Sequence, residues 1–155
     1  MFVWRVCALK YQDTAFSGLG GLYVPGRWHT QGQKIVYTAE NLALASLEIF
    51  VHLESDRVSL VAIKAHIPDE LEIEEINRES LPANWQGSQS YSKLQLIGKD
   101  WLRSRRTPIL KVPSAIVPVE NNYLLNPDHP QFKLVPEPAL EFRFDRRMWK
   151  NLTDN

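Results

Sequence analysis

The segment LALASLEIFVH, residues 42–52, is the longest apolar run of the chain, and any fold must bury most of it. Its composition predicts a helix that continues to about Ser55, with Asn41 as the N-cap. Glu48 interrupts the run, and no Lys or Arg lies three or four residues away on either side. Because an unpaired buried carboxylate is costly, Glu48 either faces solvent beside His52 or is held in a cleft for its charge.

Length and composition favour one domain that spans residues 1–155. The 155 residues are 44% hydrophobic, which is enough for one core and too little for two. Lys and Arg together number 18, as do Asp and Glu, so no bulk charge predicts nucleic acid or an anionic membrane as the main partner. The single cysteine, Cys7, excludes an internal disulfide and fits a cytoplasmic protein. We expect neither a signal peptide nor a membrane span, which needs about 20 apolar residues.

The order of the predicted elements indicates an α+β fold. About six strands and two helices are expected, and most do not follow a βαβ order. A second helix is predicted over 89–104. The segment 109–118 is expected as an edge or terminal strand because it holds two prolines, and 121–135 as a turn-rich loop that leads to a strand. The other predicted strands cover 2–7, 34–39, 57–67 and 139–145, with an edge strand or turn at 70–76.

A glycine-rich loop and two arginines suggest a binding site for phosphates. Residues 17–33 contain five of the seven glycines, so their backbone is expected to approach another group closely. Arg27 lies in this loop, and Arg5 lies inside an apolar strand. Two guanidinium groups can bind a pyrophosphate, and either one is a candidate partner for Glu48. The alternatives are an outward-facing Arg5 and an Arg27 stacked on Trp28. Neither the P-loop nor the dinucleotide-binding glycine motif is present.

Two further residues are candidates for the same site. Tyr37 ends a strand just before the helix of Glu48, where it is either a core aromatic or a ring that stacks on a flat ligand. Ser114 follows a proline at a strand end and is not part of a G-x-S-x-G motif. The histidines lack the spacing of metal ligands, so no metal site is predicted. RSRR at 103–106 is expected to be a solvated surface, with nucleic-acid contact as the alternative.

Taken together, these segments resemble the RES domain family, which is named for Arg, Glu and Ser. Its members are toxins of the bacterial Xre–RES toxin–antitoxin type. The matching segments are WR at 4–5, GRWHTQGQKIVYTAENLALASLE at 26–48, VH at 51–52 and PSAIVPVENNYLLNPDHP at 113–130, whereas 68–100 carries little signature. One departure is His29, where many members have Asn.

The resemblance implies an ADP-ribosyltransferase-like fold in which two small sheets pack at an angle around an NAD cleft, with flanking helices. It assigns Arg5, Glu48 and Ser114 to catalysis, and Arg5, Arg27, Tyr37 and Ser114 to NAD binding. It implies that NAD is the substrate and that its nicotinamide–ribose bond is cleaved. A carboxylate beside that carbon would stabilise the positive charge that develops on the ribose. Ser114 would either bind the ligand or position Glu48.

Three functions remain open on the sequence. The first is a toxin that depletes NAD as a glycohydrolase or phosphorylase, and the second is an ADP-ribosyltransferase with a protein target. The third is a non-catalytic binding module in which Arg5 and Glu48 form a structural ion pair. For the first two, the resemblance implies a cytoplasmic protein and an Xre-family antitoxin, and it allows a homodimer within that complex. The sequence decides neither the acceptor nor the use of NADP.

Overall fold

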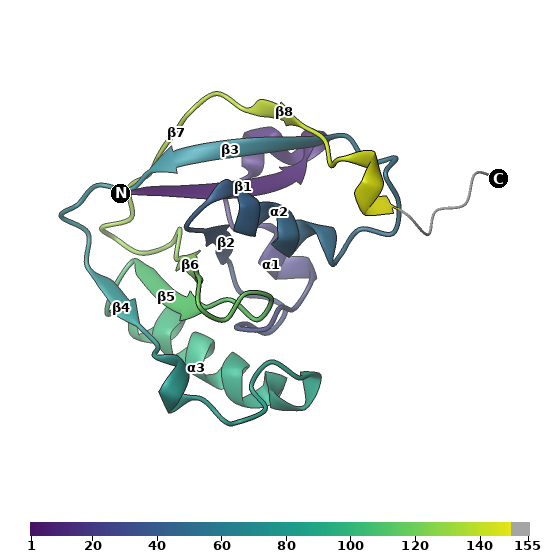
Figure 1. The fold of residues 1–155 in the computed structure, drawn as a ribbon. Coiled ribbons are helices and arrows are strands. Elements are labelled where there is room, and N and C mark those ends of the chain that lie inside the picture. Colours follow the sequence, from purple (N-terminus) through teal and green to yellow (C-terminus); the bar gives the residue numbers. More distant parts are fainter. Residues whose placement is uncertain (150–155) are drawn as a thin grey trace.

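The computed structural model describes residues 1–149 and contains one mixed sheet with helices packed around it (Figure 1). The strands are β1 (Phe2–Ala8), β2 (Val36–Ala39), β3 (Leu60–His66), β4 (Ile73–Glu75), β5 (Ile109–Pro113), β6 (Asn121–Leu125), β7 (Val135–Pro136) and β8 (Leu140–Phe142). The α-helices are α1 (Gly20–Tyr23), α2 (Leu42–Phe50) and α3 (Tyr91–Ser104). Four short 3-10 helices are η1 (Leu9–Thr14), η2 (Arg78–Ser80), η3 (Ser88–Ser90) and η4 (Arg146–Trp149).

The sheet has two halves that meet between β1 and β2. Its strand order is β4-β5-β6-β2-β1-β3-β7, and β8 also pairs with β3. The halves share one registered pair, Trp4 with Ala39, whereas β1 and β3 are paired over seven residues. The predicted α+β class is confirmed. The two predicted small sheets are joined into one, but the narrow β1–β2 contact still lets the halves diverge, as β1–β3 and β5–β6 do in Figure 1.

The structure corrects the predictions for the segments that begin at 109 and 121 and for the end of the helix that carries Glu48. The segment from 109 begins an interior strand, β5, because β4 pairs with it on one side and β6 on the other. The pairing with β4 ends at Lys111, so Pro113 lies beyond that ladder. The start of the predicted loop 121–135 is β6, whose Tyr123–Leu125 residues are buried between β2 and β5. Helix α2 ends at Phe50 rather than at Ser55.

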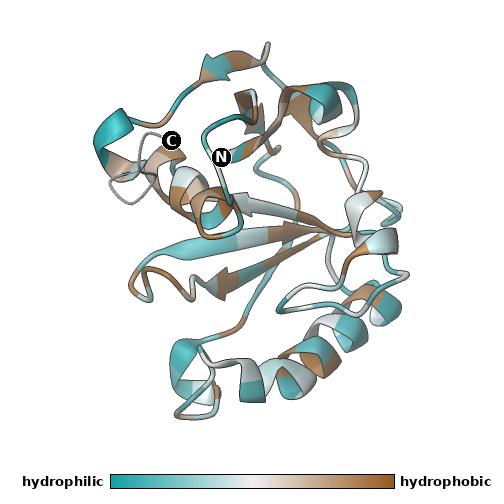
Figure 2. Cartoon of the chain, turned by 90° about the vertical axis from the view of Figure 1, so that its right-hand side faces the viewer, coloured by the Kyte–Doolittle hydropathy of each residue, from teal (hydrophilic) through white to brown (hydrophobic). Residues whose placement is uncertain are grey.

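Helix α3 covers the half of the sheet that carries β5 and β6 (Figure 1). Leu94 and Trp101 point into the core, and hydrophobic and hydrophilic residues alternate along the helix (Figure 2). Gly98 permits a close approach, because a Cβ there would collide with the Trp28 carbonyl oxygen. The Gln95 amide also donates to the Gly26 carbonyl at 2.9 Å. Helix α3 therefore holds the glycine-rich loop in place.

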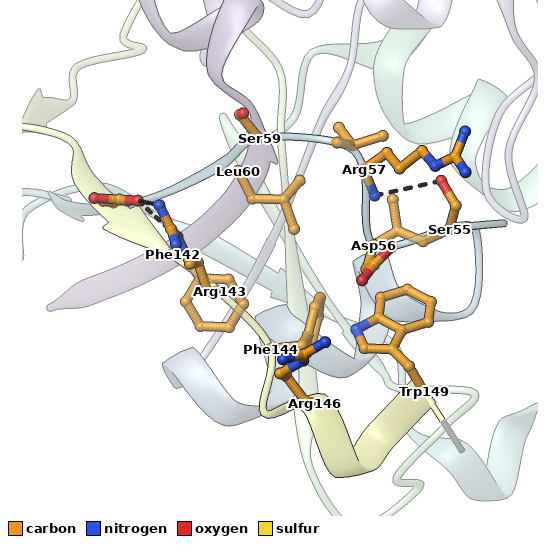
Figure 3. A pocket seen from close by; sticks show the side chains of 13 residues that line it. Ser55, Asp56, Arg57, Ser59, Leu60, Phe142, Arg143, Phe144, Arg146 and Trp149 are labelled. Carbon is orange, nitrogen blue, oxygen red and sulfur yellow. Dashed lines mark hydrogen bonds and ion pairs between the residues drawn. The ribbon is translucent and has the colours of Figure 1, made fainter. Parts of the chain in front are cut away.

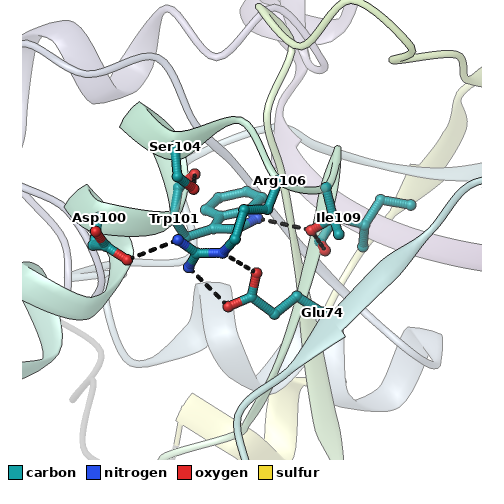
Figure 4. A network of polar contacts seen from close by, with 7 residues as sticks. Glu74, Asp100, Trp101, Ser104, Arg106 and Ile109 are labelled. Carbon is teal, nitrogen blue, oxygen red and sulfur yellow. Dashed lines mark hydrogen bonds and ion pairs between the residues drawn. The ribbon is translucent and has the colours of Figure 1, made fainter.

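A polar network ties the end of α3 to β4 (Figure 4). Arg106 donates two 3.0 Å hydrogen bonds to the Glu74 carboxylate and a third to Asp100. Beside it, the buried Trp101 indole donates to Thr107 at 3.1 Å. Of the RSRR segment, Arg106 is thus engaged in structural ion pairs. None of the helices in residues 1–149 has the length and apolarity needed to cross a membrane.

Candidate active site

Glu48 lies on α2, where two neutral side chains donate to the same carboxylate oxygen. The Ser114 hydroxyl donates to Oε1 at 2.8 Å, and the Asn122 amide donates to it at 2.7 Å. The predicted arginine partner is not found, since Glu48 takes part in none of the ion pairs of residues 1–149. The half-buried carboxylate is therefore held by hydrogen bonds from neutral groups and not by an ion pair.

The position of Ser114 explains how it acts on Glu48. Its side chain is fully buried, and its oxygen accepts 3.0 Å hydrogen bonds from the backbone N–H groups of Ile116 and Val117. A hydroxyl has one donor and two acceptor sites, and all three are in use. Of the two predicted roles, this geometry favours the positioning of Glu48 over direct contact with a ligand.

Local structure at the start of α2 fixes the helix that carries Glu48. The Asn41 side chain accepts from the Leu44 N–H at 2.8 Å, which is the predicted N-cap. The Asn41 amide also donates to Glu120 at 3.1 Å, in the loop that precedes β6. Leu44 and Ala45 are buried against the sheet. Helix α2 is thus held both by its apolar face and by a polar tie to the segment between Ser114 and Asn122.

Tyr37 on β2 has its hydroxyl fixed by the glycine-rich loop. The Trp28 N–H donates to the Tyr37 oxygen at 3.1 Å, and His29 Nδ1 lies 2.8 Å from that oxygen. His29 Nε2 lies 2.9 Å from the Val24 carbonyl, so a proton on Nε2 leaves Nδ1 to accept from Tyr37. Burial lowers the pKa of His29, in agreement with a neutral ring. Gly26 has to be glycine because a Cβ would strike the Tyr37 hydroxyl and the His29 ring.

The pKa of Tyr37 is affected by burial and by the charges of Arg27 and Glu48. Burial raises its pKa strongly, so the hydroxyl keeps its proton at neutral pH. The charge of Arg27 opposes this shift in pKa, whereas Tyr91 and Glu48 add to it. All three groups are therefore close enough to act on the Tyr37 hydroxyl.

Arg27 is bound by the segment that precedes α3. Its Nη1 donates to the carbonyls of Trp85 and Gln86 at 3.0 and 2.9 Å, and its guanidinium lies 4.7 Å above the Tyr91 ring. The predicted stacking on Trp28 is not observed, because Trp28 is buried beneath α3. The Gln86 amide also donates to the Ala115 carbonyl at 2.8 Å, next to Ser114. The 82–90 segment thus lies between Arg27 and the Glu48 site.

Arg5 contacts the candidate site through the backbone carbonyl of Tyr37. Its Nη1 donates to the Tyr37 carbonyl at 2.8 Å, and its Nε is buried without a hydrogen-bond partner among residues 1–149. Burial lowers the pKa of Arg5 from its ordinary value. Arg5 is therefore an inward-pointing residue and not the outward-facing one of the structural alternative.

The structure brings the five predicted residues into one connected region. Glu48 and Ser114 are in direct contact, the charges of Arg27 and Glu48 both act on the pKa of Tyr37, and Arg5 donates to the Tyr37 carbonyl. Sequence reasoning missed Asn122, His29 and Tyr91 as members of the region. Asn122 lies within the segment 113–130, which resembles the family. Nothing in the sequence around Asn122 indicates that it contacts Glu48.

Two surface cavities are described, and none of the five predicted residues lines either of them. One of about 430 Å³ is formed by residues 53–60 together with the C-terminal segment around Phe144 and Trp149 (Figure 3). The other, of about 310 Å³, is lined by residues 75–79, 113, 118, 119 and 121 and lies next to Ser114 and Asn122 in sequence. Among residues 1–149, no group of His, Cys, Asp and Glu side chains is arranged to hold a metal ion.

Comparisons with a family model and with known proteins agree on one family. The family model described as the RES domain matches residues 2–147. The chain is 34% identical over 154 residues to "Toxin Res" of Photorhabdus laumondii, covering 97% of this chain and 98% of that protein. It is 36% identical over 152 residues to the "Prs ADP-ribosylating toxin" of Sphingobium sp., covering 94% of each.

A solved structure has the same fold. The crystal structure of the M. tuberculosis MbcT–MbcA toxin–antitoxin complex contains a chain that aligns with a TM-score of 0.74 at 11% identity. The alignment covers 97% of the present chain and 87% of the other. At this identity the likeness establishes the fold alone.

Proposed function

The chain belongs to the RES domain family, and from this premise we propose that it is a toxin that consumes NAD by cleaving the nicotinamide–ribose bond. We further propose that the domain spans residues 1–155. The names of the relatives support the proposal, since three of them are called Toxin Res and one a Prs ADP-ribosylating toxin. The residues of the site support it independently.

The observation that carries the proposal is the state of the Glu48 carboxylate. It is half-buried, it is held by a hydroxyl and an amide, and it forms no ion pair among residues 1–149. A structural carboxylate would be expected to pair with an arginine, and such a pair would cancel its field. An uncompensated carboxylate fixed by neutral donors can instead stabilise a positive charge that appears during a reaction.

The cleavage of NAD generates such a charge. The bond between C1′ of the ribose and the ring nitrogen breaks, its electron pair leaves with the now neutral nicotinamide, and C1′ becomes cationic in character. Glu48 would stabilise that carbon, and an acceptor hydroxyl would then bond to it and release a proton. Water or phosphate as the acceptor gives NAD degradation. The stabilisation exists only as the bond breaks, so it would lower the barrier rather than strengthen substrate binding.

The remaining residues would bind and orient the nucleotide. Arg27 and Arg5 are proposed to serve the pyrophosphate, with Arg27 exchanging the Trp85 and Gln86 carbonyls for phosphate oxygens, which are stronger acceptors. The protonated Tyr37 is proposed to pack against the nicotinamide side of the site, close to Glu48. Binding energy gained at the pyrophosphate would thereby fix the ribose beside the carboxylate.

The test is the incubation of the pure protein with NAD, with the products separated by chromatography. We expect free nicotinamide together with ADP-ribose, or with its phosphorylated form when phosphate is the acceptor. Glu48→Gln keeps the shape and the acceptor oxygen for Ser114 and should abolish both NAD consumption and toxicity in cells. An equally active Glu48→Gln protein would refute the catalytic role of Glu48.

A second candidate is ADP-ribosyltransfer to a protein, favoured by the relative from Sphingobium, whose name gives that activity. Both reactions use the same cationic ribose, and only the acceptor differs. The same incubation separates them, because a transferase turns over NAD only when its target protein is added. The third function open on the sequence, a binding module with an Arg5–Glu48 ion pair, loses its support, since that pair is not among the contacts of Glu48.

We propose an antitoxin as the protein partner. The similar fold comes from a toxin–antitoxin complex, which supports a partner of this kind. The assignment of this antitoxin to the Xre family, a homodimer within the complex and a cytoplasmic location are proposals that rest on the family resemblance. Co-expression with a candidate Xre-family antitoxin, followed by purification of the complex and measurement of its mass, tests the first two together.

A further inference from the structure

Asn122 contacts the proposed catalytic carboxylate directly. Its Nδ2 donates to Glu48 Oε1 at 2.7 Å, the shorter of the two hydrogen bonds to that oxygen. The orientation of the amide is unambiguous, because the reversed amide would place two acceptor oxygens against each other. Ser114 and Asn122 therefore both bind Oε1, and neither binds Oε2.

The fold holds Asn122 from both sides. On β6, Asn122 pairs with Ala39 of β2 and with Val112 of β5, so it sits in the interior of the sheet. Only 8% of the residue is exposed. A side chain mounted on a central strand is a more rigid reference point than one on a loop.

The other end of the amide makes no contact that would explain its presence. Asn122 Oδ1 is buried and has no hydrogen-bond partner among residues 1–149. A buried unpartnered carbonyl oxygen is unfavourable for folding, and an apolar residue there would avoid that penalty. The benefit that offsets the penalty must come from the Nδ2 end, which faces Glu48.

We propose that Asn122 is a positioning residue that fixes Glu48 through Oε1 and leaves Oε2 as the oxygen that faces the reacting ribose. This inference rests on the proposed NAD-cleaving function. Asn122 and Ser114 reach the carboxylate from two different segments, so together they fix its rotation. Because both donors are neutral, they orient Glu48 without cancelling its charge.

Two variants test the role. Asn122→Ala removes the donor together with the unpartnered oxygen, so we expect kcat for NAD cleavage to fall about tenfold or more, as when an orienting hydrogen bond is lost. KM should change by less than about threefold, because the interaction acts on the transition state. The melting temperature should change little, because the lost hydrogen bond to Glu48 and the removal of the unpartnered oxygen have opposite effects on stability. A merely structural Asn122 would give the opposite result, a lower melting temperature with unchanged kcat.

Asn122→Asp gives a readout that a structural role would not produce. The aspartic acid placed there can donate to Glu48 while it is protonated, but once ionised it repels the carboxylate. The proximity of Glu48 raises the pKa of the new carboxyl, so we expect kcat to decline as the pH rises from about 5 to about 8, with the wild type lacking this decline. On the neighbouring strand β2, burial raises the pKa of Tyr37, so its hydroxyl stays protonated over this pH range.

Asn121→Ala is the matched control. Asn121 precedes Asn122 on the same strand, and its amide also donates to a carboxylate, that of Glu40 at 3.3 Å. We expect wild-type kcat and a flat response at the pH values used. If the wild type cleaves NAD and Asn122→Ala retains wild-type kcat, the positioning role is wrong while the proposed function stands. If the wild type fails to cleave NAD with water, phosphate or a protein acceptor, the proposed function itself is wrong.

Discussion

Ser114→Ala should damage stability and activity together, because one hydroxyl serves three partners. The hydroxyl donates to Glu48 and accepts from the N–H groups of Ile116 and Val117. The substitution leaves those two N–H groups without an acceptor at a fully buried serine position. It also frees the Glu48 carboxylate to rotate about its remaining bond to Asn122.

The size of the effect follows from these contacts. The backbone of Ile116 and Val117 is half-buried, so water can reach it in part, and each lost N–H acceptor is assigned about 1 kcal/mol. The hydrogen bond to the charged carboxylate contributes about another 1.5 kcal/mol. The free energy of unfolding should therefore fall by about 3.5 kcal/mol, which lowers the melting temperature by about 7–14 °C for a domain of this length.

Urea unfolding followed by circular dichroism measures this difference, with a lower midpoint at unchanged m. The control is Ser46→Ala on α2, whose hydroxyl donates only to the Ala43 carbonyl, and it should change the free energy of unfolding by less than about 0.5 kcal/mol. The reasoning would be refuted by a Ser114→Ala protein with wild-type stability. If that protein were destabilised but kept full kcat, Ser114 would be structural and would not position Glu48.

Two further perturbations test the loop and its arginine. Arg27→Ala should weaken NAD binding, measured by calorimetry, by more than about tenfold, while it lowers the free energy of unfolding by no more than about 2 kcal/mol. The control is Arg57→Ala, which changes an exposed arginine. An equal loss of NAD binding in the two variants would contradict the assignment of Arg27 to the pyrophosphate. Burial lowers the pKa of His29. As the pH is lowered below about 6.5, the unfolded chain therefore takes up a proton before the folded chain does, and the free energy of unfolding decreases. His29→Asn should reduce this loss between pH 7.5 and 5.5 in urea unfolding, and an unchanged loss would assign it to other histidines.

The local signals of the sequence predicted elements better than they predicted pairing. Asn41 as the N-cap of α2 was correct because capping depends on neighbouring residues. The position of the 109–113 strand in the sheet was wrong because its two prolines suggested an edge, whereas β4 pairs with only part of it. Asn121–Leu125 was expected to be a loop, since two asparagines and a following Asn-Pro are typical of turns. Burial between β2 and β5 overrides that preference.

In the candidate site, too, the sequence identified residues better than it identified their contacts. Family resemblance selected Arg5, Arg27, Tyr37, Glu48 and Ser114, and the structure brings them into one connected region. The resemblance offered a Ser114–Glu48 contact as one of two alternatives, but the contact between Asn122 and Glu48, which are 74 residues apart, was not predicted. His29 was noticed only as a departure from the family pattern, yet it lies 2.8 Å from the Tyr37 hydroxyl. A single sequence identifies residue types, while the partner of each depends on strand order.

The search for an arginine partner of Glu48 rested on an incomplete premise. A buried carboxylate must be satisfied, and a cation is one way to satisfy it, but hydrogen bonds from neutral groups are another. An ion pair and neutral hydrogen bonds differ in how much of the carboxylate charge remains available for catalysis. A salt bridge would place a positive charge where the ribose becomes positive and would oppose the reaction. Ser114 and Asn122 satisfy one oxygen and leave the net charge intact. The absence of an ion pair at Glu48 within residues 1–149 therefore agrees with the proposed cleavage of NAD.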